Sequence, residues 1–335
     1  MTVFRFIYRR IATAFLAIVA VLIATFLLVR LTPDPVATLA GPDATAEQLQ
    51  MVEKQIGLDK SVPEQFLAYA RNILAGDFGR SWISGRPVLQ EIAEKAPSTI
   101  ELLLWGVAIG TIVGVTIGLH AAYARDGWFD QFTRLLSLVG FSVPTYFLGL
   151  IALLVFFYFL EWAPPGMGRL SPLYTPPDHV TGSYIIDGFL AGNFDIALSA
   201  ASQLVLPVLC IAIICAAPTI KQTRALALEV LEGDYVRYGK ALGMSPRMIR
   251  GMVLRNCLAP IVTFVGIELV SLMGTTAIIE YVFSWGGLGQ YGLSAIMKGD
   301  FNAVQGYVLV LACFCALIFI VVDLVVLLIE PRGRE

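Results

Sequence analysis

Charged residues are scarce in this sequence of 335 residues, where Asp, Glu, Lys and Arg make up only 14% and the net charge is -2. Soluble proteins carry about 25% charged residues, so lipid must cover much of a surface this poor in charge. The same scarcity excludes a disordered chain, which would be polar and charge-rich. A net charge near zero gives no reason to expect nucleic acid as a partner. Because 57% of the residues are hydrophobic, we expect a membrane protein surrounded by the lipid bilayer.

Cysteine and histidine are also few, with five and two residues respectively. All five cysteines lie in or beside apolar stretches, whereas disulfide frameworks lie in polar extracellular loops. No Cys/His spacing predicts a metal site, and the cysteines are interpreted as small core residues. We therefore expect no metal and no cofactor bound by this chain.

Catalytic and nucleotide-binding motifs are missing. The sequence contains no GxxxxGK[ST], no HExxH and no Gly-x-Ser-x-Gly. Residues 287–292 match GxGxxG, but they follow a membrane helix rather than a strand, so a dinucleotide-binding fold is not indicated. The chain is predicted not to be an enzyme.

Six stretches are long and apolar enough, or nearly so, to cross a bilayer, which takes about 20 residues per helix. Lys and Arg concentrate in the segments that lie inside if the N-terminus is cytoplasmic. We therefore expect an all-α membrane protein with six transmembrane helices and both termini in the cytoplasm. The first apolar run is longer than the usual signal-peptide core of about 7–15 residues, which favours a retained anchor. The six stretches are residues 11–29, 102–119, 135–160, 204–220, 261–279 and 307–329.

These spans predict four regions along the chain. Residues 1–31 form an N-terminal cytoplasmic segment with the first span, and residues 32–99 form an extracytoplasmic segment. Candidate capping boxes at 45–48 and 61–64, each followed by amphipathic spacing, predict helices in this segment. Residues 100–330 form the core with a cytoplasmic loop at about 221–257, and residues 331–335 form a cytoplasmic tail.

The second span has glycine at every fourth position, which places four glycines on one helix face. Close backbone approach is what attracts helices to one another in lipid. We therefore expect a neighbouring helix to pack on this glycine stripe, which consists of Gly106, Gly110, Gly114 and Gly118.

Three prolines and one acidic residue lie within the other predicted spans. Pro144 is expected to break the third span, and Pro207 and Pro218 the fourth, at points that face protein or a water-filled path because lipid cannot satisfy freed carbonyls. Glu268 lies inside the fifth span, where a carboxylate costs about 2.5–3.5 kcal/mol. It should face the bundle interior, either in a structural hydrogen bond or on a pathway.

The loop between spans four and five predicts a helical hairpin. A helix over about 223–242 would end at Gly243 in a positive-φ conformation. Ser245 would then cap a second helix with Pro246 at its first position. A hairpin this small has the form of a knob for a partner's groove, and the alternative is a basic linker touching anionic lipid.

Several segments together resemble a known family. Residues 229–237, 240–243 and 254–256 resemble the coupling loop of permeases in binding-protein-dependent ABC importers, and more specifically the first permease subunit of dipeptide and oligopeptide importers. Gly239 departs from the family's usual alanine, Leu242 from a frequent lysine, and Gly286 from a frequent proline. Further matches follow in the same order along nearly the whole chain, at residues 34–36, 57–60, 76–81, 86–88, 283–289 and 304–306.

The resemblance implies a type I ABC importer permease fold in the bacterial inner membrane and the import of short peptides. It implies three kinds of protein partner: a second homologous permease subunit in a pseudo-twofold heterodimer, two cytoplasmic ATPases that hold ATP and Mg²⁺, and an extracytoplasmic substrate-binding protein. Two alternatives stay open. The same machinery could import nickel, glutathione or another small solute, or the chain could be a stand-alone secondary carrier or an intramembrane enzyme.

The resemblance also suggests functional residues. Expected to shape or contact the ATPase-coupling knob are Glu229, Asp234, Arg237 and Gly243; expected to line a translocation path are Ser142, Pro144 and Glu268.

Overall fold

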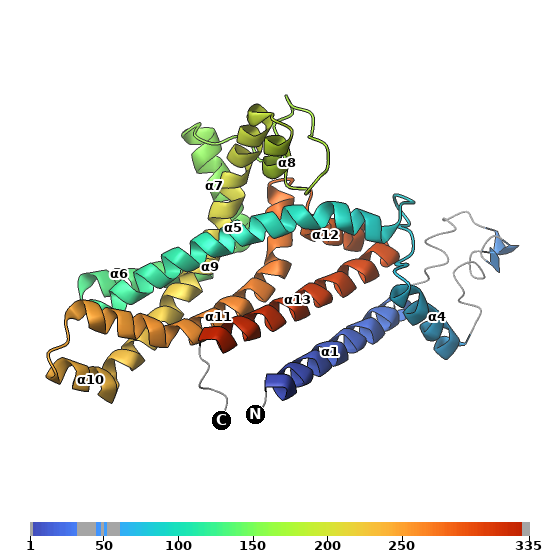
Figure 1. Ribbon diagram of the computed structural model, residues 1–335. Helices are drawn as coiled ribbons and strands as arrows, with labels where there is room; N and C mark the ends of the chain where they lie inside the picture. Colours follow the sequence, from blue (N-terminus) through green and yellow to red (C-terminus); the bar gives the residue numbers. More distant parts are fainter. Residues whose placement is uncertain (1–2, 32–44, 48–49, 52–60, 330–335) are drawn as a thin grey trace. The chain divides into compact units, whose positions relative to one another are not determined.

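The computed structural model describes residues 3–31, 45–47, 50–51 and 61–329. Within these residues the regular secondary structure is helical, apart from one isolated β-bridge between Arg80 and Pro87, and irregular segments such as residues 160–183 connect the helices. The predicted all-α class is confirmed. Figure 1 shows the helices, which in chain order are α1 (Val3–Leu31), α4 (Val62–Leu74), α5 (Val88–Tyr123), α6 (Trp128–Ser142), α7 (Thr145–Ala152), the π-helix η1 (Leu153–Phe159), α8 (Tyr184–Leu190), α9 (Phe194–Glu232), α10 (Asp234–Ala241), α11 (Pro246–Val282), α12 (Leu288–Lys298) and α13 (Phe301–Ile329).

Five continuous helices are long and apolar enough to cross a membrane: α1, α5, α9, α11 and α13. The third predicted span is instead a broken pair, in which α6 meets the segment formed by α7 and η1 at 103°. The break lies at Pro144, as predicted, because proline disfavours helical backbone at the residue before it and Val143 has ψ 124°. A single tilted helix over residues 135–160 therefore does not form.

Prolines inside α9 and α11 leave those helices continuous. α9 runs through Pro207 and Pro218, and α11 runs through Pro260. The expectation that Pro207 and Pro218 break the fourth span is therefore wrong. An internal proline costs a helix about 3 kcal/mol, which tertiary packing can outweigh. α9 is the most buried of the five candidate spans and contacts α6, α7, α8, α10 and α11, so neighbours hold its backbone on several sides.

The helical hairpin between spans four and five is present with shifted boundaries. α9 continues to Glu232 rather than giving way to a separate helix at 223, and the chain breaks at Gly233, whose backbone is extended. The positive φ predicted for Gly243 is confirmed at +76°. Ser245 caps α11 as predicted, since its Oγ accepts a hydrogen bond from the Met248 amide. α11 then continues into the fifth span without a gap.

Contacts divide the chain into two units, of which the first holds residues 97–290 and 317–329. In this unit α9 is the central element, and Figure 1 shows α8 near one end of it and α10 at the other. The loop before α8 is held by Asp187, whose carboxylate accepts hydrogen bonds from the amides of Thr181 (2.7 Å), Gly182 (3.0 Å) and Val180 (3.3 Å). Burial alone would raise the pKa of Asp187, but the hydrogen bonds outweigh it and lower that pKa below its ordinary value.

The second unit holds the described residues among 3–96, together with 291–316. Asp300 precedes α13 and caps it by accepting a hydrogen bond from the Ala303 amide (3.2 Å). The same carboxylate accepts from Ser81 Oγ (2.5 Å) and from the Trp82 amide (3.2 Å). Asp300 therefore ties the outer segment at 81–83 to the start of α13.

Helix α4 begins as the sequence predicts. The Glu64 carboxylate accepts a hydrogen bond from the Ser61 amide at 3.1 Å, which completes the carboxylate half of a capping box. The other candidate box at 45–48, and the family-like residues 34–36 and 57–60, lie wholly or partly outside the described residues.

The GxGxxG match at 287–292 is explained by helix packing. A Cβ at Gly287 would lie 2.5 Å from Oε1 of Glu280, and a Cβ at Gly289 would lie 2.7 Å from the Ala277 backbone. Glu280 is fully buried and accepts hydrogen bonds from Thr99 Oγ1 (2.5 Å) and the Gln290 amide (2.7 Å). Gly287 thus makes room for the buried Glu280 carboxylate and Gly289 for the backbone of α11, and the part of the chain that the structure describes has no β-strand of a nucleotide-binding fold around them.

Candidate functional site

The hairpin formed by α10 and the first turns of α11 is anchored by buried apolar side chains, among them Val236 and Ile249. Val236 on α10 is fully buried against Ala227 of α9 and Val253 of α11. Apart from Val236 and Gly239, the residues of α10 are exposed. Asp234 and Arg237 form an exposed ion pair at 3.7 Å, and Glu229 lies exposed on α9. The hairpin is therefore a knob with charged groups on a buried apolar root.

Sequence reasoning missed the apolar part of this knob. Four large side chains on it are exposed, and their exposed fractions run from 46% for Tyr235 to 69% for Tyr238. Aromatic side chains and Met are enriched where proteins meet one another. The spacing of Tyr235 and Tyr238 along α10 was the available signal, but the hydrophobic pattern does not reveal which face of the helix is covered. The four are Tyr235, Tyr238, Leu242 and Met248.

Two departures from the family pattern have local explanations. Gly239 is buried, and a Cβ there would lie 2.9 Å from the Met244 sulfur, so the glycine matches the methionine that packs on it. Gly286 has φ +72° and its amide donates to Gln290 Oε1 at 2.7 Å. Proline has neither that φ nor an amide hydrogen. The loop therefore has a conformation that proline, the residue frequent in the family pattern at this position, cannot adopt.

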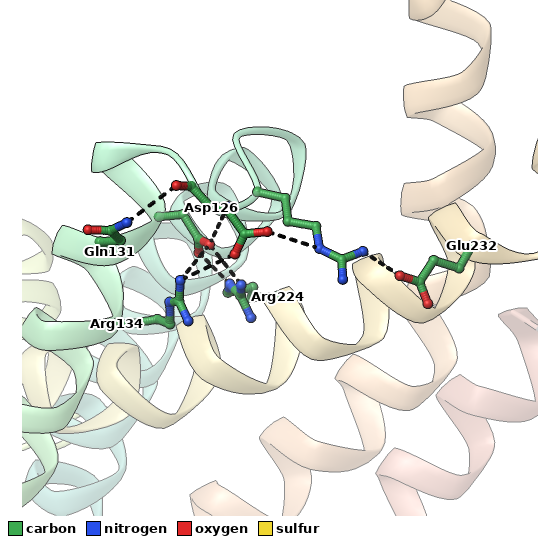
Figure 2. A network of polar contacts seen from close by, with 7 residues as sticks. Asp126, Gln131, Arg134, Arg224 and Glu232 are labelled. Carbon is green, nitrogen blue, oxygen red and sulfur yellow. Dashed lines mark hydrogen bonds and ion pairs between the residues drawn. The ribbon is translucent and has the colours of Figure 1, made fainter.

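A charged network fastens α6 to α9 (Figure 2). The side chain of Asp130, at the start of α6, is fully buried and accepts hydrogen bonds from two nitrogens of Arg224 on α9, one of them at 2.8 Å. Arg134 also reaches Asp130, at 3.3 Å. The Asp126 amide donates to the same carboxylate at 2.9 Å. The two arginines together thus neutralise and hold one buried acid.

The network extends along the turn between α5 and α6. Arg125 pairs with Glu232, the last residue of α9, and Arg134 lies 3.7 Å from Asp126. Asp126 itself has φ +60°, a left-handed conformation that Asp and Asn tolerate better than most residues. The turn is thus bound to α9 at two places, through Asp130 with Arg224 and through Arg125 with Glu232.

A cavity of about 650 Å³ lies beside this network, between α6, α9 and α11. Glu268 lines it, together with Lys221, Arg134 and Ser137. Ser142 and Pro144, the other two residues expected on a path, are exposed at the α6–α7 break and do not line this cavity. Of the three, only Glu268 lines this cavity.

The glycine stripe on α5 faces α9 throughout its length. Cβ atoms added at these glycines would lie between 2.5 and 2.8 Å from atoms of α9, including backbone carbonyl oxygens at Gly110 and Gly118. Real Cβ atoms do not approach so closely, so only glycine permits this helix separation. The α9 residues in closest approach are Ile211, Ala212, Thr219 and Ile220.

Metal-binding geometry is not found among the described residues, where no three His, Cys, Asp or Glu side chains gather. Cys210, Cys215 and Cys257 are buried free thiols.

Comparison with known proteins assigns the chain to a family. Residues 114–335 match the family described as binding-protein-dependent transport system inner membrane component, and residues 3–103 match the N-terminal region of the same kind of component. The chain belongs to this family. It is therefore a multi-pass inner-membrane permease component, which is a transport subunit and not itself catalytic.

Curated relatives match along the full length of the permease. It is 34% identical to a probable D,D-dipeptide transport system permease of Escherichia coli K12, covering 100% of this chain and 99% of the relative. It is 35% identical to a di/tripeptide transport system permease of Pseudomonas aeruginosa, with 98% of each chain covered. A dipeptide transport system permease of Alkalihalophilus pseudofirmus is 32% identical over 97% of each chain.

Proposed function

We propose that this permease is one transmembrane subunit of an ATP-driven importer of short peptides. The observation that supports it is the full-length similarity to permeases named for dipeptide and tripeptide transport, at 32–35% identity. The chain pairs with a second, homologous permease subunit. Two cytoplasmic ATPases hold ATP and Mg²⁺, and an extracytoplasmic binding protein delivers the peptide. This chain has no ATPase site of its own.

The hairpin knob supplies the coupling. ATP-driven closure of the ATPases moves the knob, and because α10 is rooted through Val236 on α9 and α11, both helices move with it. The exposed Tyr235 and Tyr238 fill an apolar groove on the ATPase, while Asp234 and Arg237 form polar contacts at its edge. A bundle with two stable arrangements then opens alternately to the two sides of the membrane, biased by nucleotide.

Gly243→Val tests the coupling role. A β-branched residue is strained at φ +76°, so the variant should distort the knob while leaving the membrane helices intact. The assembled transporter in proteoliposomes should then lose peptide uptake and peptide-stimulated ATP hydrolysis. Gly251→Val is the matched control, because Gly251 lies on α11 of the same hairpin with open space around it.

Uptake by Gly243→Val at the rate of the Gly251→Val control would contradict the proposed coupling. The cargo is tested separately by mass spectrometry of the ligand that copurifies with the binding protein. A short peptide supports the proposal, and nickel, glutathione or another small solute would replace its cargo.

A further inference from the structure

The cavity between α6, α9 and α11 contains two charges of opposite sign that the protein leaves free. Glu268 on α11 and Lys221 on α9 both line it, and neither has an ion-pair or hydrogen-bond partner among the described residues. The two other cations on its wall, Arg134 and Arg224, are already engaged by Asp130. The available charge is therefore one carboxylate and one ammonium.

The remaining wall carries three uncharged polar residues, Thr133, Ser137 and Gln222, and is otherwise apolar. Ser137 Oγ is buried with no hydrogen-bond partner in the described structure, although a buried hydroxyl normally has one. The apolar lining is broad enough for side chains of different shape and consists of Leu138, Phe141, Ala217, Pro218, Ile220, Ala225 and Phe264.

The size and charge of this space limit what fits. Small-molecule sites typically measure about 300–1,000 Å³, and this cavity of about 650 Å³ lies within that range. An anion alone would leave Glu268 unpaired in the middle of a membrane helix, and a cation alone would leave Lys221 unpaired. A zwitterion satisfies both charges, and its uncharged middle would meet the apolar wall.

We infer that this cavity is a transit site for zwitterionic cargo, where Glu268 receives an ammonium group and Lys221 a carboxylate. This inference rests on the proposed function, because a short peptide with free ends is such a zwitterion. The site recognises the two termini that all unmodified peptides share and makes only apolar contact with the side chains. It therefore holds peptides without selecting their sequence.

The test measures binding to the assembled permease–ATPase complex in nanodiscs without binding protein, by saturation-transfer difference NMR. Three probes are compared: alanyl-alanine, its N-acetyl derivative and its C-terminal amide. In the wild type, either cap should reduce the signal about tenfold, as expected for one lost charge-assisted hydrogen bond. Glu268→Gln should abolish the effect of the acetyl cap alone, and Lys221→Met the effect of the amide cap alone.

Matched controls are Glu161→Gln and Lys298→Met, which remove one charge each outside the cavity and should keep the wild-type pattern. Equal yields of assembled complex show that the variants fold. No signal in the wild type, or loss of discrimination at both ends in either single variant, overturns the transit site. Peptide uptake by wild-type proteoliposomes is measured in parallel. Its absence overturns the peptide function itself, whereas uptake with unchanged cap effects in the cavity variants overturns the site alone.

Discussion

Removing the buried carboxylate of Asp130 should weaken the joint between α6 and α9. Asp130→Asn keeps the side-chain volume but leaves Arg224, only 19% exposed, without its anionic partner. Truncating one partner of a fully buried ion pair costs about 3–5 kcal/mol. Because Arg224 retains some access to water, we expect a smaller loss of about 2–3 kcal/mol.

Asp126→Asn is the matched control for this change. Asp126 lies in the same network, but its side chain is 74% exposed and its ion pairs measure 3.6 and 3.7 Å. Exposed pairs contribute less than about 1 kcal/mol, and Asn tolerates the positive φ at this position. The control therefore alters the network's charge by the same amount with a far smaller expected effect.

The measurement is the midpoint of thermal unfolding of the purified permease, followed by intrinsic fluorescence. Asp130→Asn should lower the midpoint by about 5 °C relative to Asp126→Asn. Adding Arg224→Met to Asp130→Asn should restore part of the loss, because the unpaired cation is then gone. Equal midpoints for the two single variants would show that the buried pair does not stabilise the joint.

Three further predictions follow from local geometry. Gly110→Ala places a methyl group 2.7 Å from a carbonyl oxygen of α9 and should lower the yield of folded permease several-fold. The control Gly251→Ala, which has open space around it, should leave the yield unchanged. Equal yields of the two variants would contradict the tight contact between α5 and α9. Gly286→Pro removes the φ +72° conformation and the hydrogen bond to Gln290, so the unfolding midpoint should fall. A variant as stable as the wild type would refute this local explanation. The pKa of Asp187 is lowered in the folded loop, so the stability that its carboxylate contributes is fully present above the ordinary pKa of 3.8 and is lost as the pH falls through the lowered pKa. Limited proteolysis of residues 161–183 should therefore accelerate only below about pH 3.8. In the Asp187→Asn variant, the loop should be cut equally fast at pH 7 and pH 3.

Proline shows how far sequence reasoning reaches in this fold. Pro144 interrupts a helix, whereas Pro207, Pro218 and Pro260 remain inside helices, although all four look alike in sequence. The difference is tertiary, because α9 is enclosed by neighbours that hold its backbone through the lost hydrogen bonds. A proline in the sequence shows where a helix is locally disfavoured, but not whether tertiary packing keeps the helix continuous there.

Contacts between residues far apart in the chain could likewise not be predicted from the sequence. The regular spacing of the glycine stripe predicts a packed face but does not name α9 as the helix that packs there. Asp130 and Arg224 meet across 94 positions of sequence, with no motif linking them. Glu268 stood out because a lone acid in an apolar span is conspicuous, whereas Lys221 and Ser137 became meaningful only when three helices placed them around one cavity.

The unbroken length of α9 has a mechanical consequence. Its 39 residues form a rod of about 58 Å that joins the loop held by Asp187 to the hairpin anchored by Val236. A tilt of about 5° about the middle of such a rod displaces its two ends by about 2.5 Å in opposite directions. The rod is least stiff at Pro207 and Pro218, where helices bend most readily. A displacement of the hairpin is therefore transmitted along α9 to the loop at its other end, and the helix can bend at the two prolines between them.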